Sequence, residues 1–239
     1  MHGCCLLRGI VRSARPANIP TLFTNAAVAW MLTGCHGTAG LYAAVVLMGL
    51  CFYLYGMWEN DRVDARWDAV RYPDRPVPCG EVGTAALRMM ALGAGLCGLV
   101  LNLALGGWFV AGALLLIVIS LYNLLHKSWA GAVVLMGLCR GLWVLCAGAI
   151  FVHVSGGDSL PVGMLWYAGG LFAFTCVISI VARREAGRPA VQAAVGVLLS
   201  GMCLFDALWL FGGGSWLAVA AVALWGVARL LQKRGVRAT

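Results

Sequence analysis

Oxygen-bearing side chains that could bind a divalent cation gather in one polar stretch, residues 59–81, which holds six of the nine acidic residues. If this stretch is helical, Asn60, Asp64 and Asp68 fall at i, i+4 and i+8 on one face. Asp61 lies one turn before Asp64. Carboxylates this close repel one another unless a cation neutralises them, and Mg²⁺ prefers oxygen ligands completed by water and substrate phosphates. The spacing therefore predicts a magnesium site that suits a diphosphate ligand.

The same stretch has a second interpretation, a solvated loop in which acidic and basic side chains alternate and pair. Four arginines are interleaved with the acids and could form such pairs: Arg62, Arg66, Arg71 and Arg75. The charge pattern by itself leaves both interpretations open.

The rest of the chain must place this stretch at a membrane, because 62% of the 239 residues are hydrophobic and only 11% are charged. A bilayer core about 30 Å thick needs roughly 20 apolar residues per helix. Such runs, which lack the alternation of a barrel strand, predict an all-α polytopic bundle of about eight transmembrane helices in a single domain, residues 1–239. The predicted spans are Ile19–Gly34, Leu41–Trp58, Thr84–Leu101, Trp108–Leu125, Trp129–Phe151, Val162–Ala182, Val191–Phe211 and Trp216–Leu231.

The basic residues predict how the chain is oriented. Sixteen of the seventeen Lys and Arg residues lie in the two termini and in alternate connections, or just inside the spans that border them. The positive-inside rule then predicts a multi-pass integral membrane protein, of a bacterial inner membrane, with both termini cytoplasmic. Topology and contact with membrane lipid account for the net charge of +8, so no nucleic-acid partner is needed. No His/Cys spacing predicts zinc.

Three segments resemble the UbiA superfamily of intramembrane prenyltransferases. The polar stretch reads N-D-x-x-D-x-x-x-D over residues 60–68 and R-P-x-P-x-G over residues 75–80, which resembles the first signature of that superfamily. Residues 15–21, ahead of the first span, are similar to the corresponding family segment. Tyr122 to Lys127 resembles the family motif in which a tyrosine and a lysine face the diphosphate.

The resemblance implies Mg²⁺-dependent transfer of an isoprenoid group from a prenyl diphosphate to an aromatic or other lipophilic acceptor within the membrane. Family members commonly have nine transmembrane helices, one more than predicted here. The resemblance implies metal binding by Asn60, Asp61, Asp64 and Asp68, catalysis by Asp64, Asp68, Tyr122 and Lys127, and substrate binding by Asn18, Arg75 and Lys127.

A second family motif, two or three aspartates that hold another Mg²⁺ across the cavity, is expected between spans six and seven. The chain offers only one acidic residue there, Glu185, which is the candidate ligand. Three arginines could instead bind the diphosphate through their guanidinium groups, namely Arg183, Arg184 and Arg188. Alternatively, the segment is a plain basic loop, or catalysis has been lost and the cavity holds a lipid. A degenerate second motif on a short chain resembles the EboC-type branch of the superfamily.

Two charges are predicted within the membrane. Arg140 lies thirteen residues beyond Lys127, roughly 20 Å deep at 1.5 Å per residue, and Asp206 lies at a comparable depth. A lone arginine at that depth is costly unless it is paired or meets water. The two residues could form a buried ion pair, or Arg140 could reach an anionic substrate in the cavity.

Aromatic residues allow two interpretations as well. Trp58, Trp143 and Tyr122 could line a cavity and stabilise an allylic cation, or they could belong to an interfacial belt and to helix packing.

Two other function classes compete with prenyl transfer. The first is a non-catalytic lipid-binding protein, or one associated with export of a secondary metabolite, on the same fold. The second, a transporter built from inverted repeats, has less support because the two halves show no corresponding broken helices.

Overall fold

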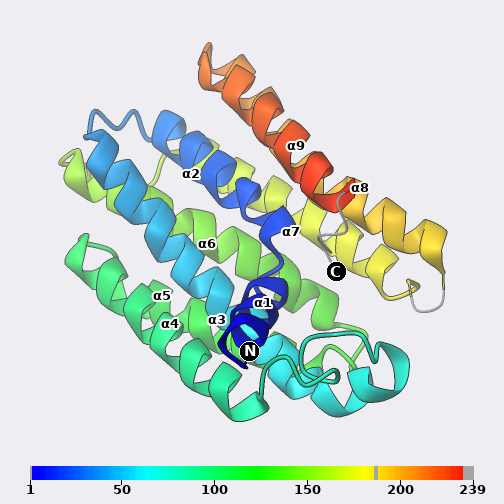
Figure 1. The fold of residues 1–239 in the computed structure, drawn as a ribbon. Helices are drawn as coiled ribbons and strands as arrows, with labels where there is room; N and C mark the ends of the chain where they lie inside the picture. Colours follow the sequence, from blue (N-terminus) through cyan, green and yellow to red (C-terminus); the bar gives the residue numbers. More distant parts are fainter. Residues whose placement is uncertain (1, 186–187, 234–239) are drawn as a thin grey trace.

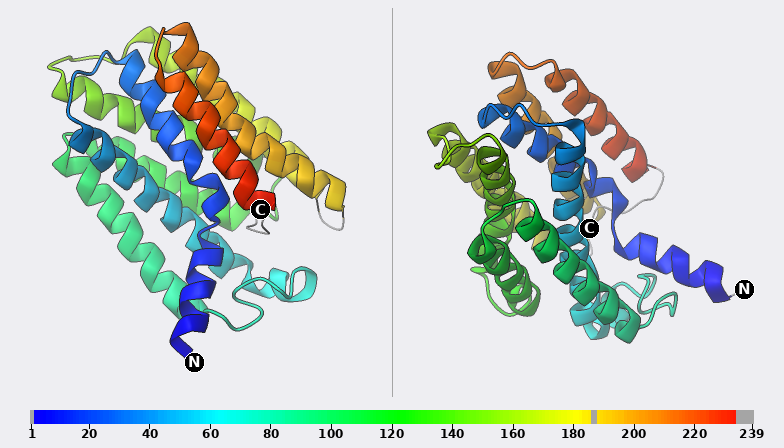
Figure 2. Two further views of the ribbon diagram at one scale, coloured as in Figure 1. Left: turned by 45° about the horizontal axis from the view of Figure 1, so that its top comes forward. Right: turned by 90° about the vertical axis from the view of Figure 1, so that its left-hand side faces the viewer.

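The computed structural model describes residues 2–185 and 188–233, with side chains from residue 5 onward, and contains no strand within them. The all-α fold class predicted from the sequence is confirmed. The helices lie side by side in one bundle (Figures 1 and 2). In chain order they are α1 (His2–Ser13), η1 (Pro16–Asn18), α2 (Pro20–Leu32), α3 (Ala39–Arg71), α4 (Thr84–Ala104), α5 (Phe109–Leu125), α6 (Ala132–Val154), α7 (Val162–Ala182), α8 (Pro189–Gly212) and α9 (Leu217–Lys233).

All eight predicted spans are helices, α2 to α9. Among the described residues, five are long and apolar enough to cross a membrane, namely α3, α4, α6, α7 and α8. The other three are shorter, because α2 has 13 residues and α5 and α9 have 17 each. At 1.5 Å per residue, 13 residues extend only about 20 Å, so α2 lies within the bundle without the length to cross a bilayer core.

Helix α3 is much longer than its predicted span and carries the polar stretch on its last turns. The Thr38 side chain accepts a hydrogen bond from the Leu41 amide at its start, and the helix ends after 33 residues at Arg71. A loop then leads to α4 and turns at Gly80, whose φ of +77° suits glycine. The acidic residues up to Asp68 are therefore helical, as the metal-site interpretation requires.

The loop returns against α3 through a small apolar cluster. Val82, Leu87 and Ala91 are buried against Trp58. Trp58 therefore fixes the loop to the helix, and it is not among the residues that line the cavity described below.

The sequence did not predict α1, which projects from one end of the bundle (Figure 2). Arg12 donates hydrogen bonds to the Glu81 carboxylate at 2.7 Å and to the Asp74 carbonyl at 2.6 Å, which ties α1 to the loop. Leu7 and Val11 stay exposed. The helix is thus apolar on one side and ion-paired on the other.

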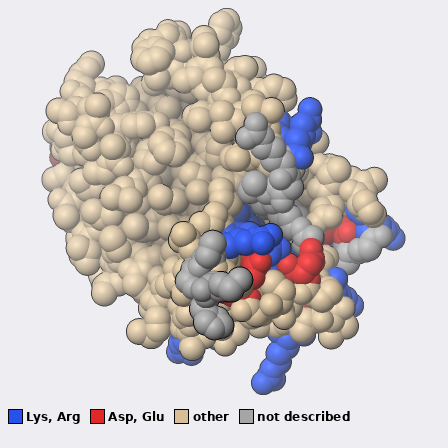
Figure 3. Space-filling model, viewed as in Figure 1, with Lys and Arg blue, Asp and Glu red and all other residues tan. Residues whose placement is uncertain are grey.

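The main core lies where α2, α3, α6, α7 and α8 meet, and it includes Val28, Met48, Ile150, Leu171 and Met202, each fully buried. The Trp143 ring lies directly against Gly49, where a Cβ atom would overlap it. Glycine therefore lets the α6 tryptophan reach the backbone of α3. Charged side chains gather at one end of the face shown in Figure 3, and most of the rest of that face is uncharged.

Candidate functional site

A cavity of about 420 Å³ opens inside the bundle, lined by residues from η1, α2, α3, α5, α6, α7 and α8 and from the connections after α3, α5 and α7. Its deeper wall is mainly apolar and includes Leu22, Phe52, Leu115 and Met202. Its other end carries charged and polar side chains: Arg15, Asn60, Asp64, Arg75, His126, Lys127, Arg183 and Glu185. The cavity thus has the polarity of a lipid with a charged head and an apolar tail.

The acid stripe, by which we mean Asn60, Asp61, Asp64 and Asp68 on α3, is buried beside the polar end of the cavity. Asn60, Asp61, Asp64 and Asp68 are each at most 7% exposed. Buried carboxylates need partners, since an isolated charge out of water is costly. Each of the three aspartates has a basic partner from another segment or from beyond the end of α3.

Two residues directly after α5 contact the Asp64 carboxylate. Its Oδ2 lies 3.0 Å from Lys127 Nζ and 3.2 Å from His126 Nε2. The ring of His126 stacks on Tyr122, with centroids 5.1 Å apart, and all four side chains line the cavity. The motif at residues 122–127 and the acid stripe therefore meet in one place, although they are far apart in sequence.

Asp68 is held by Arg75 from the following loop. Arg75 Nη1 lies 2.7 Å from Asp68 Oδ2, and the Arg75 guanidinium also covers the ring of Tyr72 at 4.5 Å. The other carboxylate oxygen, Oδ1, is buried and receives no hydrogen bond from the residues that the structure describes. The loop thus places a cation beside the stripe and leaves one acceptor free.

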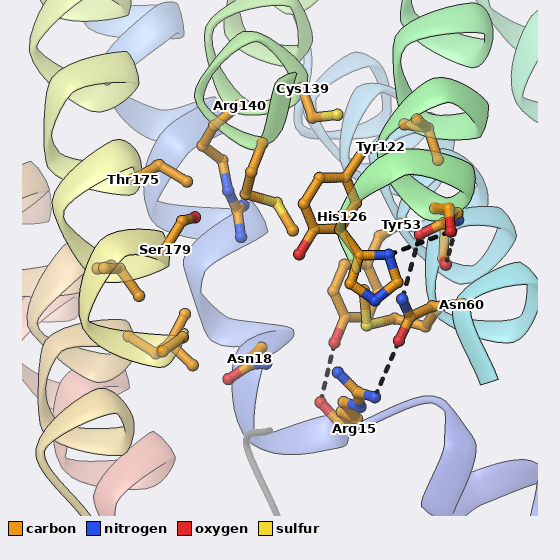
Figure 4. A pocket seen from close by; sticks show the side chains of 18 of the residues that line it. Arg15, Asn18, Tyr53, Asn60, Tyr122, His126, Cys139, Arg140, Thr175 and Ser179 are labelled. Carbon is orange, nitrogen blue, oxygen red and sulfur yellow. Dashed lines mark hydrogen bonds between the residues drawn. The ribbon is translucent and has the colours of Figure 1, made fainter. Parts of the chain in front are cut away.

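Arg15 pairs with Asp61 at 3.0 Å. It also donates to Asn60 Oδ1 at 3.2 Å (Figure 4). Its carbonyl accepts a hydrogen bond from Tyr53, and its φ of +44° is unusual for a non-glycine residue. Neither Arg15 nor His126 was among the predicted site residues. Both lie inside the segments that resemble the UbiA superfamily, and that resemblance could have identified them as site residues.

On the far side of the cavity lies the turn after α7. Arg183 and Glu185 line the cavity with Asp64, whereas Arg184 is exposed and does not. Arg183 donates to the carbonyls of His126 and Trp129, each at 3.2 Å. The turn therefore faces the acid stripe across the cavity, with Arg183 anchored beside Lys127.

Glu185 is half-buried, and its Oε2 has no hydrogen-bond partner in the described residues. Burial raises the pKa of its carboxyl above the ordinary value, against the opposing fields of Arg15, Arg75 and Lys127. This carboxyl is a second free acceptor at the polar end.

The oxygen donors at the polar end of the cavity can be compared with the ligands that Mg²⁺ requires. No group of three or more His, Cys, Asp or Glu side chains comes together among the described residues, so the five predicted ligands do not form one closed cluster. Mg²⁺ is commonly held by one or two carboxylates plus substrate phosphates. Asp64 lines the cavity and, with the Asp68 carboxyl one turn further along α3, offers hard oxygen donors for such shared binding. Asp61 and Asp68 do not themselves line the cavity.

Two further predicted residues lie along the same wall. Asn18 and Tyr122 both line the cavity, from η1 and α5 (Figure 4). Asn123, which the sequence reasoning did not single out, donates to the Gly56 carbonyl and accepts from Asn60 Nδ2. It couples α5 to the acid stripe.

Arg140 and Asp206 do not form a direct ion pair. Asp206 is fully buried and accepts hydrogen bonds from Thr24, Asn25 and Tyr167. Arg140 Nη1 instead donates to Asn25 Oδ1 at 3.2 Å. The asparagine amide bridges the two charges, because a neutral donor and acceptor from α2 stands between them.

Removal of the Asp206 carboxylate should destabilise the bundle. Asp206→Ala removes the acceptor of three buried hydrogen bonds, and at about 0.6 kcal/mol per intramembrane hydrogen bond the loss is about 2 kcal/mol. A lower midpoint of thermal unfolding in detergent, followed by reaction of the buried Cys146 and Cys203 with a thiol-reactive dye, checks this. Asp158→Ala, at an exposed aspartate, should leave the midpoint unchanged, and equal midpoints for both variants would contradict the prediction.

Comparison with solved structures decides the fold. Over 95% of this chain and 88% of the other, the protein superposes on a digeranylgeranylglyceryl phosphate synthase structure with a TM-score of 0.60 at 14% sequence identity. A UbiA homologue from Archaeoglobus fulgidus bound to DMAPP and Mg²⁺ matches 93% of this chain and 85% of its own length, with a TM-score of 0.59 at 13% identity. The chain has the fold of the UbiA homologues.

Sequence comparison also finds a similar synthase, over a shorter region of the chain. A digeranylgeranylglyceryl phosphate synthase of Methanopyrus kandleri is 36% identical over 92 residues, which is 36% of this UbiA-like chain. The match spans about a third of the length of that relative, 32%. No family profile matches the chain. The UbiA-like fold is therefore shown, and the roles assigned to individual site residues stay predictions.

Proposed function

We propose that the protein catalyses Mg²⁺-dependent transfer of an isoprenoid group from a prenyl diphosphate to a lipophilic acceptor. The observation that carries the proposal is the two-ended cavity, which places Asp64 and four basic residues at the mouth of an apolar chamber: Arg15, Arg75, Lys127 and Arg183. The structural neighbour bound to DMAPP and Mg²⁺ supports the class of donor.

At the polar end, Asp64 and Asp68, with Asn60 beside them, would hold Mg²⁺ against the diphosphate. The bound ion would neutralise charge on the leaving diphosphate and so lower the barrier to its departure. Lys127 and Arg75 are already positioned on these aspartates and would turn toward phosphate oxygens when the donor enters. Fixed positive charge in a water-poor site favours the separated diphosphate.

The bond that breaks joins carbon 1 of the isoprenoid to the diphosphate oxygen, and its electron pair leaves with the diphosphate. The Tyr122 ring lines the cavity beside His126 and would present a π face to the allylic cation. The acceptor then bonds to carbon 1 and gives its displaced proton to the released diphosphate. Trp143, farther in, has the same capacity, whereas Trp58 does not line the cavity.

A second candidate is a lipid-binding protein on the same fold without catalysis. It is favoured by the pairing of all three aspartates with protein cations and by the single acid, Glu185, in place of the second aspartate motif. In that case the ion pairs would be permanent and the cavity would hold an amphiphile without breaking it.

We further infer that the polar mouth faces the cytoplasm of a bacterial inner membrane, with both chain termini on that side. The distribution of basic residues in the sequence supports this orientation.

Purified protein with Mg²⁺ and a panel of radiolabelled isoprenyl diphosphates should release labelled diphosphate slowly even without an acceptor. Chelation of the metal with EDTA should abolish release, and added Mg²⁺ should restore it. Binding of the donors without release would favour the lipid-binding candidate. No Mg²⁺-dependent binding of any donor would overturn the proposed site.

A further inference from the structure

Two aromatic side chains at the mouth of the cavity stand out because each lies against a cation. Lys127 Nζ lies 4.9 Å from the centre of the Trp67 ring, and the Arg75 guanidinium lies 4.5 Å from the centre of the Tyr72 ring. All four side chains line the cavity. Each of these cations therefore has an aromatic neighbour as well as the aspartate that it pairs with.

Apolar packing does not explain why the two rings lie there. Trp67 is 44% exposed and Tyr72 is half-buried. Neither ring belongs to the two apolar clusters that the described residues form. The hydrophobic effect rewards only surface that is removed from water, so it gives little reason to place an indole at a polar mouth.

The end of α3 fixes both rings relative to the acid stripe. Trp67 follows Asp64 by three residues, a spacing that makes them neighbours on a helix. The Tyr72 amide donates to the Asp68 carbonyl at 2.7 Å, and the Tyr72 carbonyl accepts from the Arg75 amide at 2.9 Å. The same turns of backbone therefore carry the aspartates and the aromatic neighbours of their cations.

The two kinds of partner differ in what they leave available to a phosphate. A carboxylate neutralises the cation and competes with phosphate for it, whereas an aromatic face attracts a cation through its quadrupole and has no net charge. An ammonium group has three N–H donors and a guanidinium has five. A cation above a ring therefore keeps donors and charge for an incoming phosphate.

We propose that Trp67 and Tyr72 are positioning residues, which keep Lys127 and Arg75 at the mouth while these cations turn from the aspartates toward the diphosphate. The inference rests on the proposed function and deepens it. A metal that takes the carboxylates would leave both cations without their anionic partners. The rings would then hold them beside the diphosphate.

An outer cation lies on the same indole. The Arg71 guanidinium is 3.6 Å from the centre of the Trp67 ring. Arg71 is exposed and does not line the cavity. It therefore contacts the indole from outside the site, which helps to fix the ring that Lys127 uses inside.

The test measures Mg²⁺-dependent binding of radiolabelled inorganic pyrophosphate to the full chain in nanodiscs, beside binding of an uncharged isoprenoid alcohol, farnesol. Trp67→Leu removes the aromatic face and should weaken pyrophosphate binding about fivefold, the usual worth of one cation–π contact at a partly exposed site. Trp67→Phe keeps an aromatic face and should recover most of this loss. Farnesol binding should not change in either variant, whereas general damage to the cavity would weaken both probes.

Tyr72 allows the same comparison. Tyr72→Leu should weaken pyrophosphate binding about fivefold for the same reason, and Tyr72→Phe should bind as wild type does. Should Trp67→Leu fail to fold, this second pair of variants decides the outcome.

The matched control is Trp166→Leu, which makes the same change at an exposed tryptophan of α7 and should bind both probes as wild type does. A double-mutant cycle tests whether Trp67 acts through its lysine. In a Lys127→Met background, Trp67→Leu should cause little further loss of pyrophosphate binding.

The inference is overturned if wild-type protein binds no pyrophosphate, or if Trp67→Leu and Trp166→Leu bind it alike. It is also overturned if farnesol binding falls with pyrophosphate binding, or if Trp67→Leu costs as much in the Lys127→Met background as in wild type. Failure of the proposed function is separable, because pyrophosphate binding needs no bond to break. Wild-type protein that binds pyrophosphate in this Trp67-dependent way but releases nothing from any isoprenyl diphosphate would overturn prenyl transfer alone.

Discussion

Asp64→Asn is expected to reduce Mg²⁺-dependent release of diphosphate by about 10²- to 10³-fold, comparable with the loss of one preorganised group that stabilises transition-state charge. Asparagine keeps the shape of the side chain but removes the negative charge that would hold the metal. Asp64 is 4% exposed and lies where α3 meets the end of α5. An acid on the solvent-exposed surface therefore cannot take over its role at the metal. Single-turnover release from a radiolabelled isoprenyl diphosphate, measured across a Mg²⁺ titration, checks the prediction.

The matched control is Asp158→Asn, which makes the same chemical change at an exposed aspartate and should release diphosphate at the wild-type rate. The unfolding midpoint of Asp64→Asn should be measured alongside, because His126 and Lys127 lose the carboxylate that they contact. If a folded Asp64→Asn protein releases diphosphate as fast as wild type does, the acid stripe is not the metal site.

Lys127→Met is expected to lower donor affinity and release rate together, each by about tenfold. Lys127 Nζ lies 3.0 Å from Asp64 and 4.9 Å from the centre of the Trp67 ring, and its side chain is 30% exposed. It therefore stands at the mouth of the cavity, where a charge-assisted contact to phosphate oxygen is available. Initial rates at varied donor concentration separate the two effects.

Lys233→Met is the control, at the only other lysine of the chain, which lies exposed at the end of α9. Lys127→Arg should recover part of the donor affinity because it keeps the positive charge. An unchanged donor affinity in Lys127→Met would instead mean that the lysine only neutralises Asp64 within the protein.

The sequence was sufficient for the helices and for the acid stripe. Uncharged runs of transmembrane length must bury their backbone groups in helices, so all eight predicted helices formed. The spacing of Asn60, Asp64 and Asp68 needs only the 3.6-residue repeat to place them on one face, and α3 does continue through them. These features are local, and a single stretch of chain carries all the information.

Only the tertiary structure could decide which groups meet across the bundle. The pairing of Asp61 with Arg15 joins residues 46 apart, and the contact of Asp64 with His126 joins residues 62 apart. Of the two interpretations of Arg140, the direct ion pair with Asp206 is not formed, because similar depth in two helices does not fix their rotation. Asn25 from a third helix stands between the two charges. Depth follows from counting residues along one helix, whereas facing depends on how several helices pack, and that is why the sequence located Arg140 but the fold aimed it into the cavity.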